Sequence, residues 1–357
     1  MKIASIIGAR PQFIKAKPII DELRRKKIEH ILVHTGQHYD YGMSKIFFDE
    51  LDIPEPNYDL GVGSHTHGKQ TALMLEKTEK VLLKEKPDIV TVYGDTNSTL
   101  AGALAAVKLS IPVAHIEAGL RSYRLDMPEE VNRVLTDRIS NFLFCPTKTA
   151  VKNLKNEGIV KGVYLVGDVM YDAFLDSQKL LNKRKILSML KLKPKEYLLL
   201  TIHRQENTDN LENLKSILTA SVETKERVVF PIHPRTKKAI KKNELGNFEN
   251  LIFIEPVSYL DMLSLEKNAK KILTDSGGIQ KEAYWFNIPC ITLRNETEWV
   301  ETVETRWNVL VGCNPEQIVE AVKTTRPGSE DRTSYGDGRA TQRIVKELLK
   351  FGEVKEL

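Results

Sequence analysis

Three separate carboxylates occupy positions in the sequence at which a folded chain could use them for proton transfer. Asp95 and Glu117 each follow a short apolar run, and Glu129 lies in the first turn of an expected helix. Carboxylates that meet in one cleft can act as general acid and base, and their like charges would raise the pKa of at least one of them. The structural alternatives are that Asp95 caps a helix beginning near Thr96 and that Glu129 complements a helix dipole.

The segment from Thr274 to Ala283 predicts an anion site. Its triplet Ser276-Gly277-Gly278 lies between an apolar run and a helical pattern, so free backbone N–H groups should face one point at a helix N-terminus. The two glycines would let a ligand approach the backbone without a Cβ in the way. The alternative is a tight turn in which Ser276 only caps the helix.

Cationic and imidazole side chains also follow expected strands. Arg10 precedes Pro11 at the start of a helix, where a guanidinium can clamp a phosphate, and Lys15 lies further along the same helix. His203 and His233 each follow a strand and can bond a pyrophosphate or a ribose, or move a proton. The alternatives are a surface salt bridge for Arg10, a solvated position for Lys15 and structural roles for both histidines.

Several cofactor and nucleophile motifs are absent from the sequence. The first turn lacks the G-x-G-x-x-G pattern of dinucleotide-binding proteins, and neither a P-loop nor a G-x-S-x-G motif occurs. His65-Thr66-His67 has the spacing of a metal pair, but no third ligand is indicated nearby. We therefore expect neither a metal nor a cofactor.

Short apolar runs alternate with helical patterns along the chain, and this alternation must position the polar residues. Strands are predicted at 2–7, 30–35, 88–93, 112–116, 142–145, 162–166, 196–202, 227–232, 250–254, 271–274, 289–293 and 308–311. Helices are predicted notably at 11–27, 67–86, 96–109, 210–224, 277–286 and 339–350. Most strands are apolar on both alternations, which is typical of parallel strands covered on both faces. Because ligands bind at the carboxyl ends of such strands, the candidate residues should line one cleft.

The alternation breaks once, at the Lys- and Leu-rich stretch 176–195, which shows no strand pattern. We place the junction between two α/β domains at or slightly before this stretch, with an N-terminal domain of residues 1–170 and a C-terminal domain of residues 171–338. The last helix, within 339–357, is expected to pack back on the N-terminal domain. A length of 357 residues agrees with two domains.

Composition argues against some classes of function. The net charge of +5 is spread over interleaved acidic and basic residues, so a nucleic-acid partner is not indicated. No apolar run approaches the roughly 18 residues of a membrane span, so we expect no membrane partner. The cysteines, Cys145, Cys290 and Cys313, are far apart and lack a C-x-x-C pattern, which indicates free thiols in a reducing compartment. We expect a cytoplasmic protein.

In the order and spacing of its motifs the chain resembles the non-hydrolysing UDP-N-acetylglucosamine 2-epimerases along nearly its whole length. The matching segments are Gly8-x-Arg10-Pro11, Gln37-His38, Gly94-Asp95-Thr96, His115-Ile116-Glu117-Ala118-Gly119-Leu120-Arg121, Pro128-Glu129-Glu130-x-Asn132-Arg133, His203-Arg204-x-Glu206, Pro231-x-His233, Thr274-Asp275-Ser276-Gly277-Gly278-Ile279-Gln280-x-Glu282 and Tyr335-Gly336-x-Gly338. The resemblance implies an α/β fold of two Rossmann-like domains with parallel sheets facing a central cleft, in the GT-B arrangement, and a homodimer. It implies reversible conversion of UDP-GlcNAc to UDP-ManNAc, by elimination of UDP to a 2-acetamidoglucal and re-addition, without a redox cofactor.

The resemblance also implies roles for individual residues. The catalytic set is Asp95, Glu117, Glu129 and His203, in which the carboxylates exchange protons and His203 contacts the phosphates or the sugar. The substrate-binding set is Arg10, Lys15, His233, Ser276, Gly277, Gly278, Glu282 and Arg294, with Ser276 and Gly277 on phosphate and Glu282 on the ribose. A second substrate molecule, acting as an activator, would bind near Gln37, His38, Lys69 and Gln70.

Two departures from the family pattern bear on the identity of the sugar. Many members read Gly-Thr-Arg-Pro-Glu where this chain has Gly8-Ala9-Arg10-Pro11-Gln12, and Thr-Glu-Arg-Pro-Glu where it has Thr297-Glu298-Trp299-Val300-Glu301. An arginine contact is therefore missing or is supplied by another residue, such as Arg294. Both variants resemble the branch that epimerises UDP-diacetamido-uronic acids, which are the alternative substrates.

Two other functions are alternatives to a 2-epimerase. A GT-B glycosyltransferase is an alternative enzyme, and a nucleotide-sugar sensor is the non-catalytic alternative.

Overall fold

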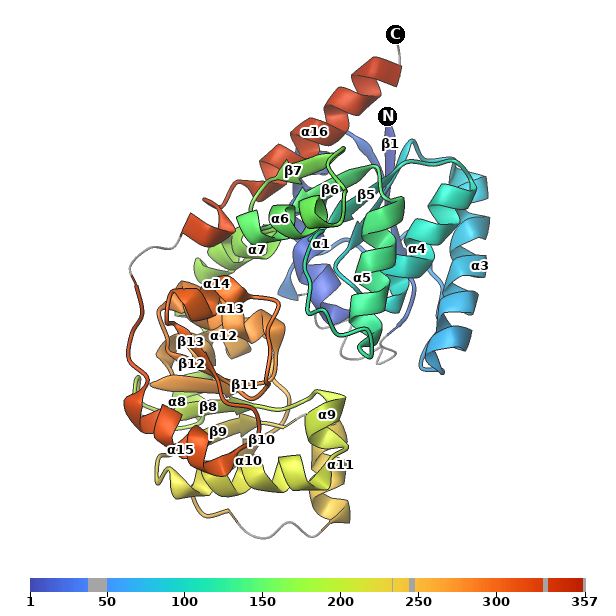
Figure 1. Ribbon diagram of the computed structural model, residues 1–357. Coiled ribbons are helices and arrows are strands. Elements are labelled where there is room, and N and C mark those ends of the chain that lie inside the picture. Colours follow the sequence, from blue (N-terminus) through green and yellow to red (C-terminus); the bar gives the residue numbers. More distant parts are fainter. Residues whose placement is uncertain (38–49, 233, 244–247, 330–332, 356–357) are drawn as a thin grey trace. The chain divides into compact units, whose positions relative to one another are not determined.

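The chain folds into two compact units, each built around a parallel sheet (Figure 1). The structure is a computed structural model and describes residues 1–37, 50–232, 234–243, 248–329 and 333–355. The first unit comprises Met1–Asp176 and Thr333–Leu357, and the second comprises Ser177–Arg332. The predicted class of two parallel-sheet α/β domains is confirmed.

The first unit contains a seven-stranded sheet in the order β3-β2-β1-β4-β5-β6-β7. Its strands are β1 (Lys2–Ile7), β2 (Glu29–His34), β3 (Tyr58–Asp59), β4 (Ile89–Tyr93), β5 (Val113–Ile116), β6 (Phe142–Cys145) and β7 (Val163–Leu165), and all neighbours pair in parallel. The strand order reverses between β1 and β4. In doubly wound sheets such a reversal opens a crevice at the carboxyl ends of the two strands, and ligands bind there.

Helices cover both faces of this sheet. They are α1 (Arg10–Arg25), α3 (His67–Glu85), α4 (Asn97–Lys108), α5 (Pro128–Ile139), α6 (Lys148–Asn156), α7 (Val169–Gln178) and α16 (Ala340–Lys355). Successive residues of a strand point to opposite faces, and β1 follows this rule. Ile3 and Ile7 pack in the core beneath α1 and α16, whereas Ala4 and Ile6 pack in the core beneath α3 and α4.

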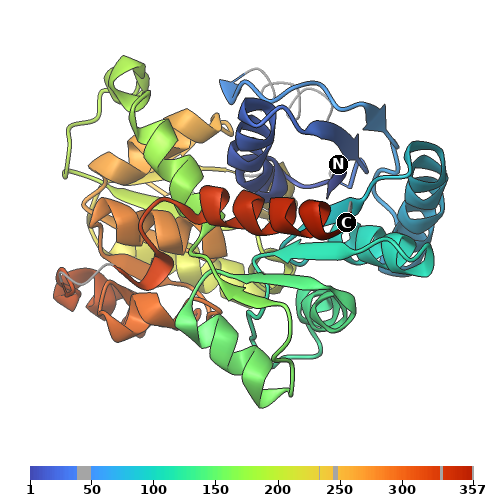
Figure 2. The ribbon, with the colours of Figure 1, turned by 90° about the horizontal axis from the view of Figure 1, so that it is seen from above.

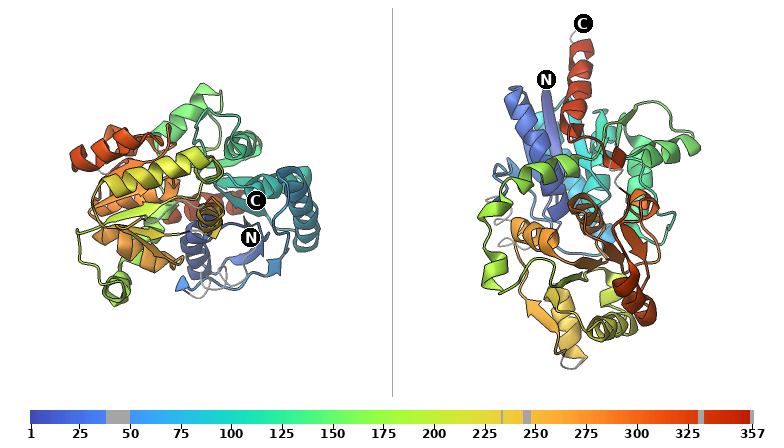
Figure 3. Two further views of the ribbon diagram at one scale, coloured as in Figure 1. Left: turned by 90° about the horizontal axis from the view of Figure 1, so that it is seen from below. Right: turned by 90° about the vertical axis from the view of Figure 1, so that its left-hand side faces the viewer.

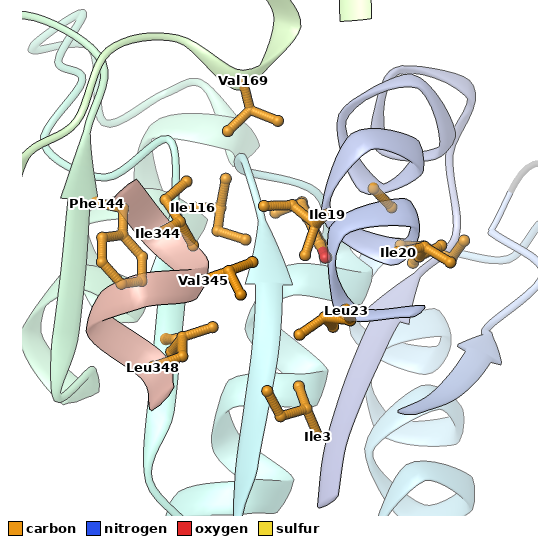
Figure 4. Packing of buried hydrophobic residues seen from close by; sticks show 14 of the residues in the cluster. Ile3, Ile19, Ile20, Leu23, Ile116, Phe144, Val169, Ile344, Val345 and Leu348 are labelled. Atoms are coloured by element: carbon orange, nitrogen blue, oxygen red, sulfur yellow. The ribbon is translucent and has the colours of Figure 1, made fainter. Parts of the chain in front are cut away.

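The last helix, α16, belongs to the first unit although it follows the whole second unit in sequence. Seen from above, it runs alongside α1 (Figure 2). Its residues Ile344, Val345 and Leu348 pack against Leu23 of α1 and Phe144 of β6 (Figure 4). The last turns of α16 therefore lie beside the start of β1 (Figure 3), and a Cβ on Gly352 would lie 2.7 Å from Met1 Sδ.

The second unit contains a six-stranded parallel sheet in the order β10-β9-β8-β11-β12-β13. Its strands are β8 (Leu198–Thr201), β9 (Val228–Pro231), β10 (Leu251–Ile254), β11 (Lys271–Thr274), β12 (Cys290–Thr292) and β13 (Asn308–Leu310). One face packs on α10 (Leu211–Glu223) and α15 (Pro315–Thr324), and the other on α8 (Ile186–Met189), α12 (Tyr259–Asn268) and α13 (Gly277–Phe286). The remaining α-helices described in this unit are α9 (Gln205–Thr208), α11 (Pro234–Lys242) and α14 (Val300–Glu304).

All twelve strands expected from the sequence are present, with ends shifted by at most two residues. The strand that the sequence did not predict is β3, which spans only Tyr58–Asp59 at the edge of the sheet. Two residues cannot show a periodic pattern, so β3 exists only because β2 pairs with it. None of the helices in the described ranges is long and apolar enough to cross a membrane.

Candidate active site

Gln12 ties together the two turns at the point where the first sheet reverses its order. Its Oε1 accepts the N–H groups of Gly8 and Ala9 at 2.8 and 3.0 Å. Its Nε2 donates to the carbonyl of Tyr93 at 2.7 Å and to Thr99 Oγ1 at 3.0 Å. Because the carbonyl can only accept, this position needs the donor that glutamine has and an ionised glutamate lacks. Gln12, where the chain departs from the family pattern, therefore holds the turn after β1 to the end of β4.

Glu117 and Lys15 form a buried ion pair at this edge of the sheet. Their side chains are 6% and 9% exposed, and Lys15 Nζ donates to Glu117 Oε1. Glu117 has a φ of +73°, a left-handed conformation that costs a residue with a side chain about 1–3 kcal/mol. A Cβ on Gly94 would lie 3.3 Å from Glu117 Oε1, so the turn that precedes Asp95 packs directly on the pair. Lys15, Glu117 and Asp168 line one pocket.

Asp95 is held by the start of helix α5. Arg133 Nη2 donates to Asp95 Oδ2 at 2.5 Å, and Asn132 Nδ2 donates to the Asp95 carbonyl at 3.0 Å. Asp95 does not cap α4, because the N-cap is Thr96, whose hydroxyl accepts the N–H of Thr99. The fold therefore does not use Asp95 as a helix cap.

The two neighbouring acidic residues at the start of α5 have different roles. Glu130 is 1% exposed and accepts the N–H groups of Ser122 and Tyr123, both at 2.9 Å, and pairs with Arg133 at 3.0 Å. Glu129 is half-buried, and none of the described residues makes a hydrogen bond or ion pair with its carboxylate. Glu130 thus holds the turn, and Glu129 has its carboxylate available for a ligand.

One of the residues predicted to bind an activator, Gln70, is connected to Asp95 through amide side chains. Gln70 is buried, and its Oε1 accepts from Asn97 Nδ2 at 2.8 Å. Asn132 Nδ2 in turn donates to Asn97 Oδ1 at 3.1 Å and to Asp95. Gln37 Oε1 accepts from the N–H and the hydroxyl of Ser98. Lys69 is exposed, and His38 lies outside the described residues.

Arg10 is the first residue of α1, one residue before the helix start predicted at Pro11. It is partly buried, and this burial lowers the pKa of its guanidinium, while the charge of Glu50 opposes the change. A guanidinium remains protonated under these conditions. Arg10 thus keeps its positive charge at the carboxyl end of β1.

In the second unit, Ser276 is the N-cap of α13, and its hydroxyl accepts the N–H of Ile279 at 3.5 Å. Gly277 and Gly278 form the first turn of that helix. A Cβ on Gly277 would lie 3.0 Å from Trp299 Nε1, so the indole fills the space beside the turn. The ammonium of Lys281, a buried residue, lies 3.7 Å from the centroid of the Trp299 ring. One side of the Gly277 turn is therefore filled by an indole with an ammonium stacked on it.

Asp275 organises the turn that carries His203. It is fully buried, and its carboxylate accepts the N–H groups of His203 and Arg204 at 3.1 and 3.0 Å. His203 Nδ1 lies 3.1 Å from the same carboxylate, with the imidazole 46% exposed. Burial would raise the pKa of Asp275, but His203 and these donors together lower it. Asp275 thus orients the imidazole of His203, and part of the ring stays exposed. His233 lies outside the described residues.

Arg294 and Glu282 are both buried within the second unit. Arg294 pairs with Glu298 at 3.1 Å and lies 3.5 Å from Glu296. These carboxylates favour a structural role for Arg294 over the ligand contact proposed from the sequence. Glu282 lies next to Glu266, a fully buried carboxyl whose pKa is raised well above its usual value by burial and by the charge of Glu282.

The fold thus gathers the candidates into two sets. In the first unit, Lys15 and Glu117 pair beside the turn that leads into Asp95, and in the second, His203, Ser276 and Gly277 lie at the carboxyl ends of β8 and β11. Sequence reasoning missed supporting residues: Gln12, His115, Asn132, Arg133, Asp137, Glu266 and Asp275. Most of these lie inside the matched motifs, but Asp137 and Glu266 show no local pattern. Among the described residues, no three His, Cys, Asp or Glu side chains are grouped to hold a metal ion.

Comparison with known proteins is consistent across the chain. The family model described as UDP-N-acetylglucosamine 2-epimerase matches residues 21–349. A UDP-N-acetylglucosamine 2-epimerase homolog from Methanococcus maripaludis is 58% identical, with 98% of this chain and 99% of the relative covered. The UDP-2,3-diacetamido-2,3-dideoxy-D-glucuronate 2-epimerase of Pseudomonas aeruginosa is 48% identical, with 98% of this chain and 100% of the relative covered.

Solved structures agree with this result. The UDP-GlcNAc 2-epimerase of Methanocaldococcus jannaschii, in complex with UDP-GlcNAc and UDP, superposes with a TM-score of 0.92 at 48% identity, with 98% of this chain and all of that chain covered. The similarity therefore extends over both units and is far above the level at which only the fold is shared. The chain belongs to the UDP-N-acetylglucosamine 2-epimerase family.

Proposed function

We propose that the protein interconverts UDP-GlcNAc and UDP-ManNAc by inverting carbon 2 of the sugar. The observation that carries this proposal is the Lys15–Glu117 pair packed against the turn of Asp95, which puts two carboxylates and a cation at one edge of the first sheet. Two carboxylates with a neighbouring cation can remove a proton from carbon and return it. The relatives named above act at the same carbon of related UDP-sugars.

The proposed reaction is an elimination followed by an addition. A carboxylate takes the proton from carbon 2 while the bond from carbon 1 to the UDP oxygen breaks, and UDP leaves with that electron pair. A proton then reaches carbon 2 from the other face, and UDP re-forms its bond to carbon 1. No net oxidation occurs, so the scheme requires no redox cofactor. The proposed acid/base groups are Asp95, Glu117 and Glu129. Asp95 and Glu117 follow β4 and β5, and Glu129, in the first turn of α5, has no competing partner among the described residues.

The second unit is the proposed UDP-binding domain. The N-terminus of α13 offers the N–H groups of Gly277 and Gly278 and the positive end of a helix dipole to the pyrophosphate. His203, held by Asp275, and Arg10 and Lys15 of the first unit are proposed to contact the phosphates or the sugar. Glu282 is proposed to accept the ribose hydroxyls. Negative charge builds on UDP as it leaves. The N–H groups of α13 and the cationic and imidazole side chains therefore stabilise the transition state more than the bound substrate.

The test is incubation with UDP-GlcNAc in D2O. We expect UDP-ManNAc carrying deuterium at carbon 2, because the proton removed exchanges with solvent before it returns. Product that retains hydrogen at carbon 2 would contradict the mechanism. Absence of any UDP-ManNAc would contradict the proposed activity.

A second candidate substrate is a UDP-diacetamido-uronic acid. The relative from Pseudomonas aeruginosa, named for that sugar, is as similar as the structure from Methanocaldococcus jannaschii, at 48% identity each. Gln12 and Trp299 also follow the pattern of that branch. Comparing kcat/KM for the two UDP-sugars decides between them, and a higher value for the uronic acid would replace the first candidate.

Removal of the Ser276 hydroxyl should weaken substrate binding. We expect Ser276→Ala to raise KM for the UDP-sugar, or to lower kcat/KM, about tenfold, as for the loss of one hydrogen bond to a charged group. The substitution also removes the N-cap of α13, which lowers stability by about 1 kcal/mol. Ser258→Ala is the control, because Ser258 caps α12 in the same unit. Unchanged KM and kcat in Ser276→Ala would remove Ser276 from the site.

We also propose a homodimer and an activator site near Gln37, His38, Lys69 and Gln70. The amide chain from Gln70 through Asn97 and Asn132 to Asp95 supports a link between that region and the catalytic carboxylates. The mass from light scattering tests the dimer. A sigmoidal dependence of initial rate on UDP-GlcNAc concentration tests the activator site.

A further inference from the structure

His115 of β5 bridges two segments that carry proposed catalytic carboxylates. The side chain is completely buried. Its Nε2 lies 2.7 Å from the carbonyl oxygen of Gly94, the residue before Asp95. Its Nδ1 lies 2.7 Å from Asp137 Oδ1 on α5. Both ring nitrogens therefore have close hydrogen-bond partners, and both partners are oxygen atoms.

The partners determine which protons the ring carries. A carbonyl oxygen only accepts, so Nε2 must carry a proton. Asp137 Oδ2 accepts from Arg121 Nη1 at 2.7 Å and from the N–H of Gly119 at 3.1 Å. Burial would raise the pKa of Asp137, but His115 and Arg121 together lower it. An ionised carboxylate also only accepts, so Nδ1 must carry a proton too, and His115 is an imidazolium.

The surrounding charges support this protonation state. Arg121 pairs with Asp137 and also with Glu157, at 2.6 Å. With His115 charged, the network holds two cations and two anions and is neutral. With a neutral imidazole the two carboxylates would share the single charge of Arg121, and Asp137, which is completely buried, would lose half of its cationic partners. An ionised carboxylate in a low-dielectric interior is costly without such partners. The nearby thiol of Cys145 adds no charge, because burial raises its pKa.

The network holds the turns of Asp95 and Glu117 in one place. The bond from His115 fixes the Gly94 carbonyl, and Gly94, with a φ of +64°, begins the turn of Asp95. The bond from Gly119 to Asp137 fixes the other end of the strained turn that contains Glu117. The ring thus joins the turn that precedes Asp95 to the carboxylate that holds the turn of Glu117.

We propose that His115 is a positioning residue, kept as a buried imidazolium, that sets the placement of Asp95 relative to Glu117. It touches neither substrate nor reacting atoms and acts through Gly94 and Asp137. The catalytic part of this inference rests on the proposed function. A shift of about 1 Å between reacting groups is enough to lower a rate about 100-fold.

The protonation state is tested on the wild-type protein without any substrate. The protein is labelled with ¹⁵N-histidine, and the ring resonances of His115 are assigned by their loss in His115→Gln. We expect two protonated ring nitrogens at neutral pH. A neutral ring, with one unprotonated nitrogen, would overturn the proposal whatever the enzyme's activity.

The positioning role is tested by deuterium partition. In D2O the intermediate returns either to starting sugar or to the epimer, and both carry deuterium. The ratio of the two deuterated sugars early in the reaction reports how the acid/base carboxylates are placed on the two faces of the sugar at carbon 2. A partly unfolded variant would lower both products equally and leave this ratio unchanged.

We expect His115→Gln to lower kcat about 100-fold, to change KM little and to shift the deuterium ratio. His30→Gln is the matched control, because His30 lies in the same sheet, on β2, and bonds Ser5 at 2.9 Å, away from the carboxyl ends of the strands. A folded His115→Gln with the wild-type kcat and ratio would overturn the positioning role. An inactive wild-type protein would instead count against the proposed function, and the imidazolium would still be tested by its resonances.

Discussion

Glu117→Gln should lower kcat about 10²- to 10⁴-fold, the range for loss of a general acid or base. The amide has nearly the shape of the carboxylate but cannot take a proton from carbon 2. UDP affinity, measured by calorimetry, should change little, because the proposed phosphate and ribose contacts come mainly from the second unit. Deuterium exchange at carbon 2 should fall with kcat. Exchange at the wild-type rate would show that Glu117 is not an acid/base group.

The ion pair with Lys15 complicates the interpretation of this variant. Removing one partner of a buried pair leaves an uncompensated charge and can cost about 3–5 kcal/mol of stability. The double variant Lys15→Met, Glu117→Gln removes both charges and should recover much of that stability. Lys15 is itself a proposed substrate contact, so the double variant should remain inactive. A stable double variant with restored turnover would contradict both assignments.

A control separates the role of this carboxylate from the general effect of losing one. Glu22 is also buried in the first unit, where it pairs with Arg25 at 2.6 Å toward the other end of α1. Glu22→Gln makes the same chemical change at a residue outside the candidate site. Its kcat and KM should match those of the wild-type protein.

Stability should fall as pH rises through the folded-state pKa of Glu266. This carboxyl is completely buried. Among the described residues, its only hydrogen-bond partner is the carboxyl group of Glu282, with which it shares a proton. A hydrogen bond between two carboxyl groups requires one of them to be protonated. Burial and the charge of Glu282 accordingly raise the pKa of Glu266 well above 4.5. The neighbouring Tyr197 and Cys290 are held neutral by burial, which raises their pKa values.

The sign follows from proton binding. A raised folded pKa means that the folded protein binds more protons than the unfolded chain between the two pKa values. This contribution to stability is complete below the unfolded value, near 4.5, and is lost as pH rises through the folded value. The free energy of unfolding should fall by up to about 1.4 kcal/mol per pH unit within that interval. Chemical denaturation from pH 5 upward measures it.

Glu266→Gln should remove this pH dependence. The amide keeps a donor for Glu282 and has no proton to lose, so the variant should be more stable than the wild-type protein at alkaline pH. Glu212→Gln is the control, because Glu212 is exposed on α10 of the same unit and should leave the wild-type pH profile intact. A Glu266→Gln profile with the wild-type slope would assign the pH dependence to another group.

The sequence by itself determined the class of the fold, the positions of nearly all strands and the family. These follow from local information, because apolar strands with both faces covered, helix starts and ordered motifs are all short-range patterns. The N-cap at Ser276 and, to within one residue, the helix start at Arg10 were likewise predictable, since the signals are adjacent in the chain.

The tertiary structure alone decided which polar side chains work together. Glu129 and Glu130 are adjacent and chemically alike, yet only the packing of the 122–123 turn engages Glu130 and leaves Glu129 available. Gln12 finds the Tyr93 carbonyl across 81 residues of sequence, and His115 meets Asp137 across 22. Hydrogen bonds need a geometry within tenths of an ångström, which strand register and helix packing supply and no local pattern encodes.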